Sequence, residues 1–168
     1  MARKSVPLTV EELDGRIVPS AAQPLTGPLP PVQIHPTHPL TGRGSGTYLS
    51  KHGNPDVGAT DTVKGAAHLE GMGQATVVGT IHAPGFIANA AYSGTMTFRN
   101  ANGAVTVALT SFRPAGPAGL PVWYRYHITK ATGTYSGMKD SGSLRLDVTL
   151  NPATGSNMDR TGTFRVTI

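Results

Sequence analysis

Apolar and polar side chains alternate with a period of two over most of residues 44–168, in short segments separated by Gly, Pro, Asn and Asp. This alternation is typical of strands that bury one face. No segment sustains the periodicity of an amphipathic helix. The pattern therefore predicts an all-β domain, with strands expected near residues 47–50, 63–70, 74–82, 92–100, 104–112, 122–130, 143–150 and 161–168.

The two faces of these strands differ in polarity. An antiparallel sheet with one apolar face can hide that face by rolling up, and about eight strands can close into a barrel without exposed edges. The sequence therefore predicts an antiparallel barrel of about eight strands. Its predicted inward positions hold no carboxylate. The inward residues that we expect to contact a small apolar ligand are Tyr92, Met96, Phe98, Tyr124 and Tyr126.

Residues 1–43 differ from the rest of the chain in composition. All ten aromatic residues lie at or after Tyr48, and eight of the fourteen prolines lie at or before Pro39. A segment with so little apolar surface cannot offset the entropy lost on ordering. We therefore expect a disordered, Pro-rich linker over residues 21–43, followed by a barrel domain over residues 44–168.

Residues 1–20 carry a motif. Residues 8–20 read LTVEELDGRIVPS, which resembles the short N-terminal motif of the planctomycete extracellular domain family. The match departs at Val10, where Leu is usual, and at Asp14, where Glu is usual. The resemblance implies export or a location in the cell envelope. The alternative interpretation is a disordered tail that matches by chance.

A second resemblance lies between the sixth and seventh predicted strands. Residues 126–144 read YHITKATGTYSGMKDSGSL, which resembles a corner of allene oxide cyclase-like and dirigent-like β-barrels. Gly133, Gly137 and Gly142 permit the positive φ angles of a tight corner, and Tyr135 can cover its apolar side. The resemblance implies the β-barrel fold of these families and says little about function. Those families guide reactive ligands with polar or acidic groups inside the barrel, and we carry over no catalytic residue.

Composition limits the chemistry of this protein. The absence of cysteine excludes disulfides, a thiol nucleophile and a cysteine-based zinc site. The formal charge is +5, but the cations are spread along the chain and form no run longer than Arg3-Lys4, whereas a nucleic-acid site would cluster them, so nucleic acid is not an expected partner. The charge is typical of a mildly basic soluble surface, and the alternative interpretation is an acidic polymer as a partner. No apolar run is long enough for a transmembrane helix, and no cofactor is expected.

The histidines offer two candidate sites. His35 and His38 are three residues apart in the linker, which is a conceivable metal pair; the alternative is that both are polar linker residues. His68, His82 and His127 fall on the polar strand face. They could converge on a metal or on acid–base chemistry only if their strands are neighbours, and otherwise they are surface residues.

The carboxylates offer less. Asp56, Asp61 and Asp159 fall in predicted loops and Asp140 in the Gly-rich corner, so we interpret all four as solvated turn residues.

The sixth predicted strand carries the candidate interface residues. Trp123, Arg125 and His127 alternate on its outward face. Trp and Arg are favoured interface anchors, so these residues predict a subunit or partner contact, for example in a homo-oligomer. The alternative is that Trp123 packs under a loop or under the N-terminal segment.

Three functions remain open at this level. The first is an exported barrel, without enzymatic activity, that binds a small apolar ligand. The second is a structural or protein-contact module. The third is a cyclase- or isomerase-type enzyme, for which Tyr92, Tyr124 and Tyr126 are the only predicted inward groups with a polar end.

Overall fold

Eight strands form wherever the sequence alternates between apolar and polar positions. A computed structural model describes residues 40–52, 58–84, 91–112, 120–152 and 159–168. Within these residues no helix is long and apolar enough to cross a membrane. The strands are β1 (Gly42–His52), β2 (Ala59–Leu69), β3 (Gly73–Ala83), β4 (Ser93–Asn100), β5 (Gly103–Ser111), β6 (Trp123–Gly133), β7 (Ser141–Leu150) and β8 (Arg160–Thr167).

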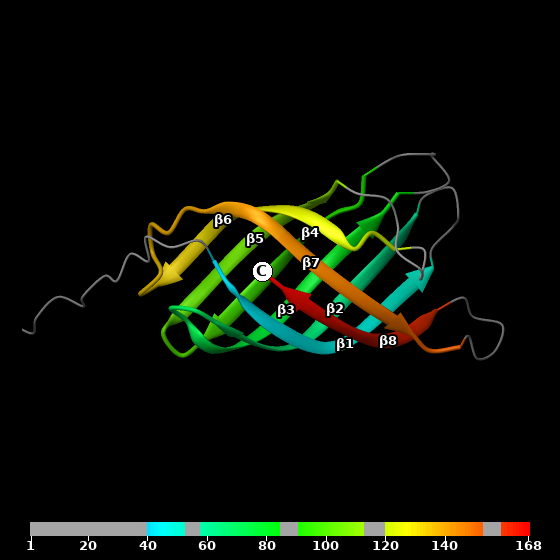
Figure 1. Cartoon of the computed structure of the whole chain (residues 1–168), viewed down its shortest axis with the longest axis horizontal. Coiled ribbons are helices and arrows are strands. Elements are labelled where there is room, and N and C mark those ends of the chain that lie inside the picture. The colour runs from blue at the N-terminus through cyan, green and yellow to red at the C-terminus, as the bar shows by residue number, and fades with distance from the viewer. Residues whose placement is uncertain (1–39, 53–57, 85–90, 113–119, 153–158) are drawn as a thin grey trace, which may run out of the picture. The chain divides into compact units, whose positions relative to one another are not determined.

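The strands close into an up-and-down antiparallel barrel, which confirms the predicted fold class. Each strand pairs with the next along the chain, and β8 returns to pair with β1 (Figure 1). Arg43 at the start of β1 faces Thr167 at the end of β8. Closure gives each of the eight described strands two neighbours, so none of them presents a row of unpaired backbone groups as a sheet edge.

The two ends of the barrel differ. At one end, here called the turn end, short connections join β2 to β3 and β4 to β5, and residues 134–140 join β6 to β7. At the other end, here called the loop end, the connections are residues 53–58, 84–92, 112–122 and 151–159. The carboxyl ends of β1, β3, β5 and β7 therefore meet the amino ends of β2, β4, β6 and β8 at the loop end.

The apolar core lies inside the barrel. In β3, for example, Ala75, Val77, Gly79 and Ile81 are buried, while the residues between them are exposed or half-buried. At about 1.5–3 kcal/mol for each large apolar side chain, such burial is the main stabilising contribution to the fold. The largest fully buried side chains are Tyr48, Tyr124, Phe98, Phe164, Leu69, Ile81, Met96, Leu109, Leu144, Leu146, Val63 and Val77.

Glycine lets two strands approach closely at one point of the wall. Gly46 of β1 pairs with Gly65 of β2. A Cβ atom on Gly46 would lie 2.5 Å from the Cα atom of Gly65 and would also meet the Lys64 carbonyl oxygen. No side chain fits there, which explains why the inward positions of β1 give so little apolar signal in the sequence.

A β-bulge interrupts β6. Thr106 pairs with Lys130, but the next residue, Val107, pairs with Ile128, so Thr129 is the extra residue. The Thr129 hydroxyl donates to the Thr106 carbonyl oxygen at 3.2 Å. Because the bulge shifts the alternation by one residue, the inward positions change phase within this strand.

Two details differ from the sequence predictions. The barrel begins before residue 44, because β1 starts at Gly42 and Leu40 is already buried. Gly133 and Gly137 have the expected positive φ angles, but Gly142 is not among the glycines of positive φ. A Cβ atom on Gly142 would lie 2.9 Å from the Tyr126 ring, so this glycine makes room for an aromatic side chain. The N-terminal motif and residues 21–39 of the predicted linker lie outside the described residues.

Candidate functional site

A buried polar cluster lies inside the barrel at the loop end. Asp61 is the third residue of β2 and has no exposed surface. Its side chain is inward because it shares the phase of Val63 on the same strand. Tyr48 of β1 donates its hydroxyl to Asp61 Oδ2 at 2.6 Å. Ser50, which pairs with Asp61 across β1 and β2, is also buried.

The prediction that Asp61 is a solvated loop residue, and that the interior holds no carboxylate, is therefore wrong. Strand β2 begins at Ala59, four residues before the predicted start at residue 63. The extension carries Asp61 into the wall, where the alternation turns its side chain inward. Asp61 Oδ1 is buried and has no hydrogen-bond partner among the described residues. An unpaired carboxylate oxygen in an apolar interior costs free energy, so this position needs an explanation.

Two further tyrosines approach Asp61 from the other side of the barrel. Tyr92 lies just before β4, and Tyr124 is the second residue of β6. Both are tied to the end of β5, because Ser111 pairs with Tyr124 and its Oγ accepts a hydrogen bond from the Tyr92 amide at 2.8 Å. Tyr124 is buried, whereas Tyr92 is half-buried and packs against the core.

The electrostatics of the cluster follow from burial and from Asp61. Burial, followed by the hydrogen bond to Asp61, raises the pKa of Tyr48 far above its ordinary value. Burial and then the charge of Asp61 also raise the pKa of Tyr92 and of Tyr124. All three hydroxyls are therefore neutral at physiological pH and can donate hydrogen bonds.

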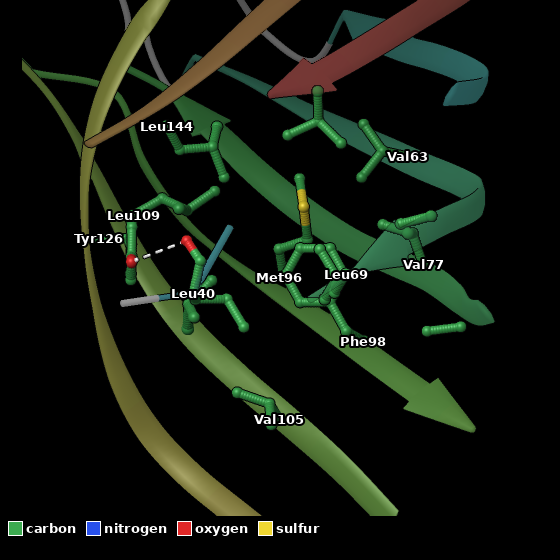
Figure 2. Packing of buried hydrophobic residues seen from close by; sticks show 14 of the residues in the cluster. Leu40, Val63, Leu69, Val77, Met96, Phe98, Val105, Leu109, Tyr126 and Leu144 are labelled. Atoms are coloured by element: carbon green, nitrogen blue, oxygen red, sulfur yellow. Dashed lines mark hydrogen bonds between the residues drawn. The ribbon is translucent and has the colours of Figure 1, made fainter. Parts of the chain in front are cut away.

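The five predicted ligand contacts do not form a single site. Tyr92 and Tyr124 lie at the loop end with Asp61. Met96 and Phe98 of β4 are fully buried in the core between the two ends (Figure 2). Tyr126 lies nearer the turn end, where its hydroxyl is already occupied.

At the turn end, Tyr126 forms a hydrogen-bonded group with Leu40 and Asp140, here called the clamp. Its hydroxyl donates to Asp140 Oδ2 at 2.6 Å. The same hydroxyl lies 3.4 Å from the Leu40 carbonyl oxygen (Figure 2). The same carboxylate oxygen accepts the Leu40 amide at 2.7 Å. Partial burial of Asp140 opposes its ionisation, but hydrogen bonds from Tyr126 and from the Leu40 and Ser141 amides outweigh it and lower the pKa of Asp140. Asp140 is therefore a structural residue and not the solvated turn residue that was predicted.

The turn-end corner is fixed by Tyr135 as well. Tyr135 is buried in the core cluster, in agreement with the predicted cover for this corner. Asn100 donates its side-chain amide to the Tyr135 hydroxyl and to the Met72 carbonyl oxygen, both at 2.8 Å. The polar groups named here at the turn end therefore have hydrogen-bond partners. Among the described residues, the buried side-chain atom that lacks one is Asp61 Oδ1, at the loop end.

The strand histidines do not converge. His68 pairs with Gln74 near the turn end of the β2–β3 hairpin, and His82 pairs with Thr60 near its loop end. Eight residues of β3 separate these positions, roughly 26 Å along a strand. His127 lies on β6, which is not a neighbour of β2 or β3. No three His, Asp or Glu side chains of the described residues gather as a metal site requires, and His35 and His38 lie outside those residues.

The predicted interface residues lie on the outer wall. Arg125 and His127 are exposed and Trp123 is half-buried. The Arg125 guanidinium lies 5.3 Å from the centre of the Phe112 ring, and the Arg145 guanidinium lies 5.9 Å from that of Trp123. These distances suit cation–π contacts. Their use as a subunit contact stays a prediction.

Two other carboxylates complete the comparison with the sequence. Asp159 is exposed, as predicted, and Asp56 lies outside the described residues. The members of the cluster that the sequence did not indicate are Tyr48, Ser50 and Asp61. One signal could have found Asp61: it lies at the spacing of Val63, Gly65, Ala67 and Leu69, so the inward alternation extends back to it.

Fold and site together define an eight-stranded antiparallel barrel with a buried carboxylate–tyrosine cluster at its loop end. The chain matches no protein-family model, no curated protein and no solved structure. The cluster can accept a hydrogen bond at Asp61 and donate others from neutral tyrosines, within otherwise apolar walls.

Proposed function

We propose that the barrel binds a small, largely apolar molecule and holds its one hydrogen-bond-donating group at Asp61. The observation that carries this proposal is the buried Asp61 Oδ1, which has no partner among the described residues. A hydroxyl or amine of a ligand would satisfy that oxygen. Ligand pockets commonly combine apolar walls with a few convergent polar groups.

The surroundings of Asp61 support a ligand of this type. Tyr48 already fixes Oδ2, so the carboxylate is oriented before a ligand arrives. Tyr92 is the half-buried member of the cluster, which makes it the member nearest to solvent. A ligand carboxylate would be repelled by Asp61, so we expect alcohols and amines to bind and acids to be rejected.

The test uses three probes of equal chain length: decanol, decylamine and decanoate, each titrated below its aggregation limit by calorimetry. We expect the alcohol and the amine to bind and the acid not to bind. The Asp61→Asn variant should lose the discrimination against decanoate. The matched control is Asp147→Asn, since Asp147 lies on the outer wall in an exposed ion pair with Arg145. Absence of binding by all three probes, or equal binding by all three, would refute the proposal.

A second candidate function is proton-transfer catalysis of the cyclase or isomerase type. The observation that favours it is the direct hydrogen bond between a buried carboxylate and a tyrosine. Asp61 would act as the base, and a neutral tyrosine would donate a hydrogen bond to the developing oxyanion. Loss of hydrogen–deuterium exchange at an enolisable ketone probe in both Asp61→Asn and Tyr48→Phe would support it. Absence of exchange in the wild-type protein would end it.

Export to the envelope or the medium is part of the same proposal. It is supported by the N-terminal motif over residues 8–20. The test is fractionation of the producing cell with the full chain and with Arg16→Ala. Equal retention of both proteins in the cytoplasm would refute export.

A further inference from the structure

A second polar site lies on the outer wall, separate from the interior cluster. Here β7, β8, β1, β2 and β3 follow one another around the barrel (Figure 1). An open groove of about 500 Å³ lies on their outer face. The residues that line it are Arg43, Gly44, Ser45, Ala66, Ala67, His68, Gln74, Asp147, Arg165, Val166 and Thr167.

Strand register places the cations of this groove next to one another. Arg43 of β1 faces His68 on one side and Thr167 on the other. Arg165 is two residues from Thr167 on β8, so it is a diagonal neighbour of Arg43. Diagonal neighbours in an antiparallel pair lie about 7–8 Å apart, within reach of long side chains. Arg43 and Arg165 thus gather positive charge at one place on the wall, although they are far apart in the sequence.

The carboxylate of the groove does not neutralise them. Asp147 of β7 faces Arg165 across the strand pair. Its Oδ1, however, accepts two hydrogen bonds from Arg145 of its own strand, at 2.9 and 3.0 Å. Among the described residues, Arg43 and Arg165 have no carboxylate within ion-pair distance. Two exposed guanidinium groups are therefore available for an external anion.

We propose that this groove binds an acidic saccharide, a sugar chain that carries carboxylate or sulfate groups. Arginine recognises such groups with paired hydrogen bonds. Ser45, Gln74 and Thr167 add hydroxyl and amide groups suited to sugar hydroxyls. No aromatic side chain lines the groove, so it lacks the stacking platform that single-stranded nucleic acid uses.

The experiment measures binding of a uronic-acid oligosaccharide, a neutral glucan of the same length and a single-stranded oligonucleotide to the full chain. The test variant is Arg43→Gln combined with Arg165→Gln. The matched control is Arg99→Gln combined with Arg160→Gln, which removes the same charge from two exposed arginines outside the groove. Thermal unfolding of all proteins reports whether the fold is retained.

We expect the uronic-acid oligosaccharide to bind the wild type and the control within about twofold of each other. The groove variant should bind it at least about tenfold more weakly, the loss that one charge-assisted hydrogen bond produces. Arg43→Lys keeps the charge but loses the planar fork, so it should weaken binding by a smaller factor. Equal loss in both double variants, equal binding of the neutral glucan, or tighter binding of the oligonucleotide would each overturn the proposal.

Discussion

The buried hydrogen bond between Tyr48 and Asp61 gives the sharpest prediction about stability. The perturbation is Asp61→Asn, which keeps the size of the side chain and an oxygen that can accept from the Tyr48 hydroxyl. A buried carboxylate carries an effective desolvation cost of several kcal/mol. Its single charge-assisted hydrogen bond returns about 1.5–3 kcal/mol. The present carboxylate is therefore a net cost to the folded state.

The size of the change can be worked out from the two oxygens. The asparagine amide carries no charge and keeps a neutral hydrogen bond from Tyr48, which contributes about 1 kcal/mol. Its NH₂ group takes the place of the unpartnered Oδ1, at a cost of about 1–3 kcal/mol. The balance is an increase of about 1–2 kcal/mol in the free energy of unfolding at neutral pH. Such a gain is expected where a protein keeps a costly group for function.

The assay is urea unfolding of the wild type, Asp61→Asn, Tyr48→Phe and the double variant, followed by circular dichroism. Tyr48→Phe removes the one hydrogen bond to the carboxylate, so we expect it to cost about 3 kcal/mol when Asp61 is present. In the Asp61→Asn background, the same change should cost only about 1 kcal/mol. The reasoning is refuted if Asp61→Asn lowers stability, or if Tyr48→Phe costs the same in both backgrounds.

Four further predictions concern pH and packing. Folding raises the pKa of four tyrosines, Tyr48, Tyr92, Tyr124 and Tyr126, above the ordinary value of 10.0. Their contribution to the free energy of unfolding is therefore fully present below pH 10.0 and is lost as the pH rises further, so tyrosinate absorbance should develop together with unfolding. The lowered pKa of the Asp140 carboxyl has the opposite sign: its contribution is present above pH 3.8 and is lost as pH falls through the lower folded value. Asp140→Asn should therefore lose less stability than the wild type in acid unfolding. Leu40→Ala should lower the free energy of unfolding by about 2–5 kcal/mol in urea, because Leu40 is buried in the core; a change under about 0.5 kcal/mol, as for surface positions, would contradict its packing. Gly46→Ala should lower the free energy of unfolding by about 3 kcal/mol or more, because the new Cβ atom would meet the backbone of β2. If it lowered the free energy of unfolding only as much as Ser45→Ala, whose side chain faces outward, the close approach of the two strands would be contradicted.

The alternation of apolar and polar side chains predicted most of the strands. The strand boundaries were predicted least accurately where the inward residue is a glycine or a polar residue. Strand β1 was expected only near residues 47–50, yet it starts at Gly42. Its early inward positions are glycines, which carry no apolar signal. The phase change at Thr129 in β6 was equally hidden, because a bulge is defined by the pairing of two strands and not by one strand alone.

The candidate site shows the same division. Tyr92 and Tyr124 were expected inside the barrel from their spacing, and both lie near Asp61. Tyr126 was assigned to the same site, but the clamp formed by Asp140 and Leu40 engages its hydroxyl. That clamp joins residues 100 positions apart, so local sequence could not indicate it.

The sequence by itself determined that apolar and polar residues alternate along the strands and which face of each strand is apolar. It therefore also determined that the sheet must curl to bury its apolar face. The tertiary structure decided which strand lies beside which, since β8 closes on β1. That closure places Arg165 beside Arg43, and the curvature of the wall brings Tyr124 toward Asp61. The physical reason is that burial depends on each residue and its neighbours along the chain, whereas hydrogen-bond partners and shared charge depend on register across strands.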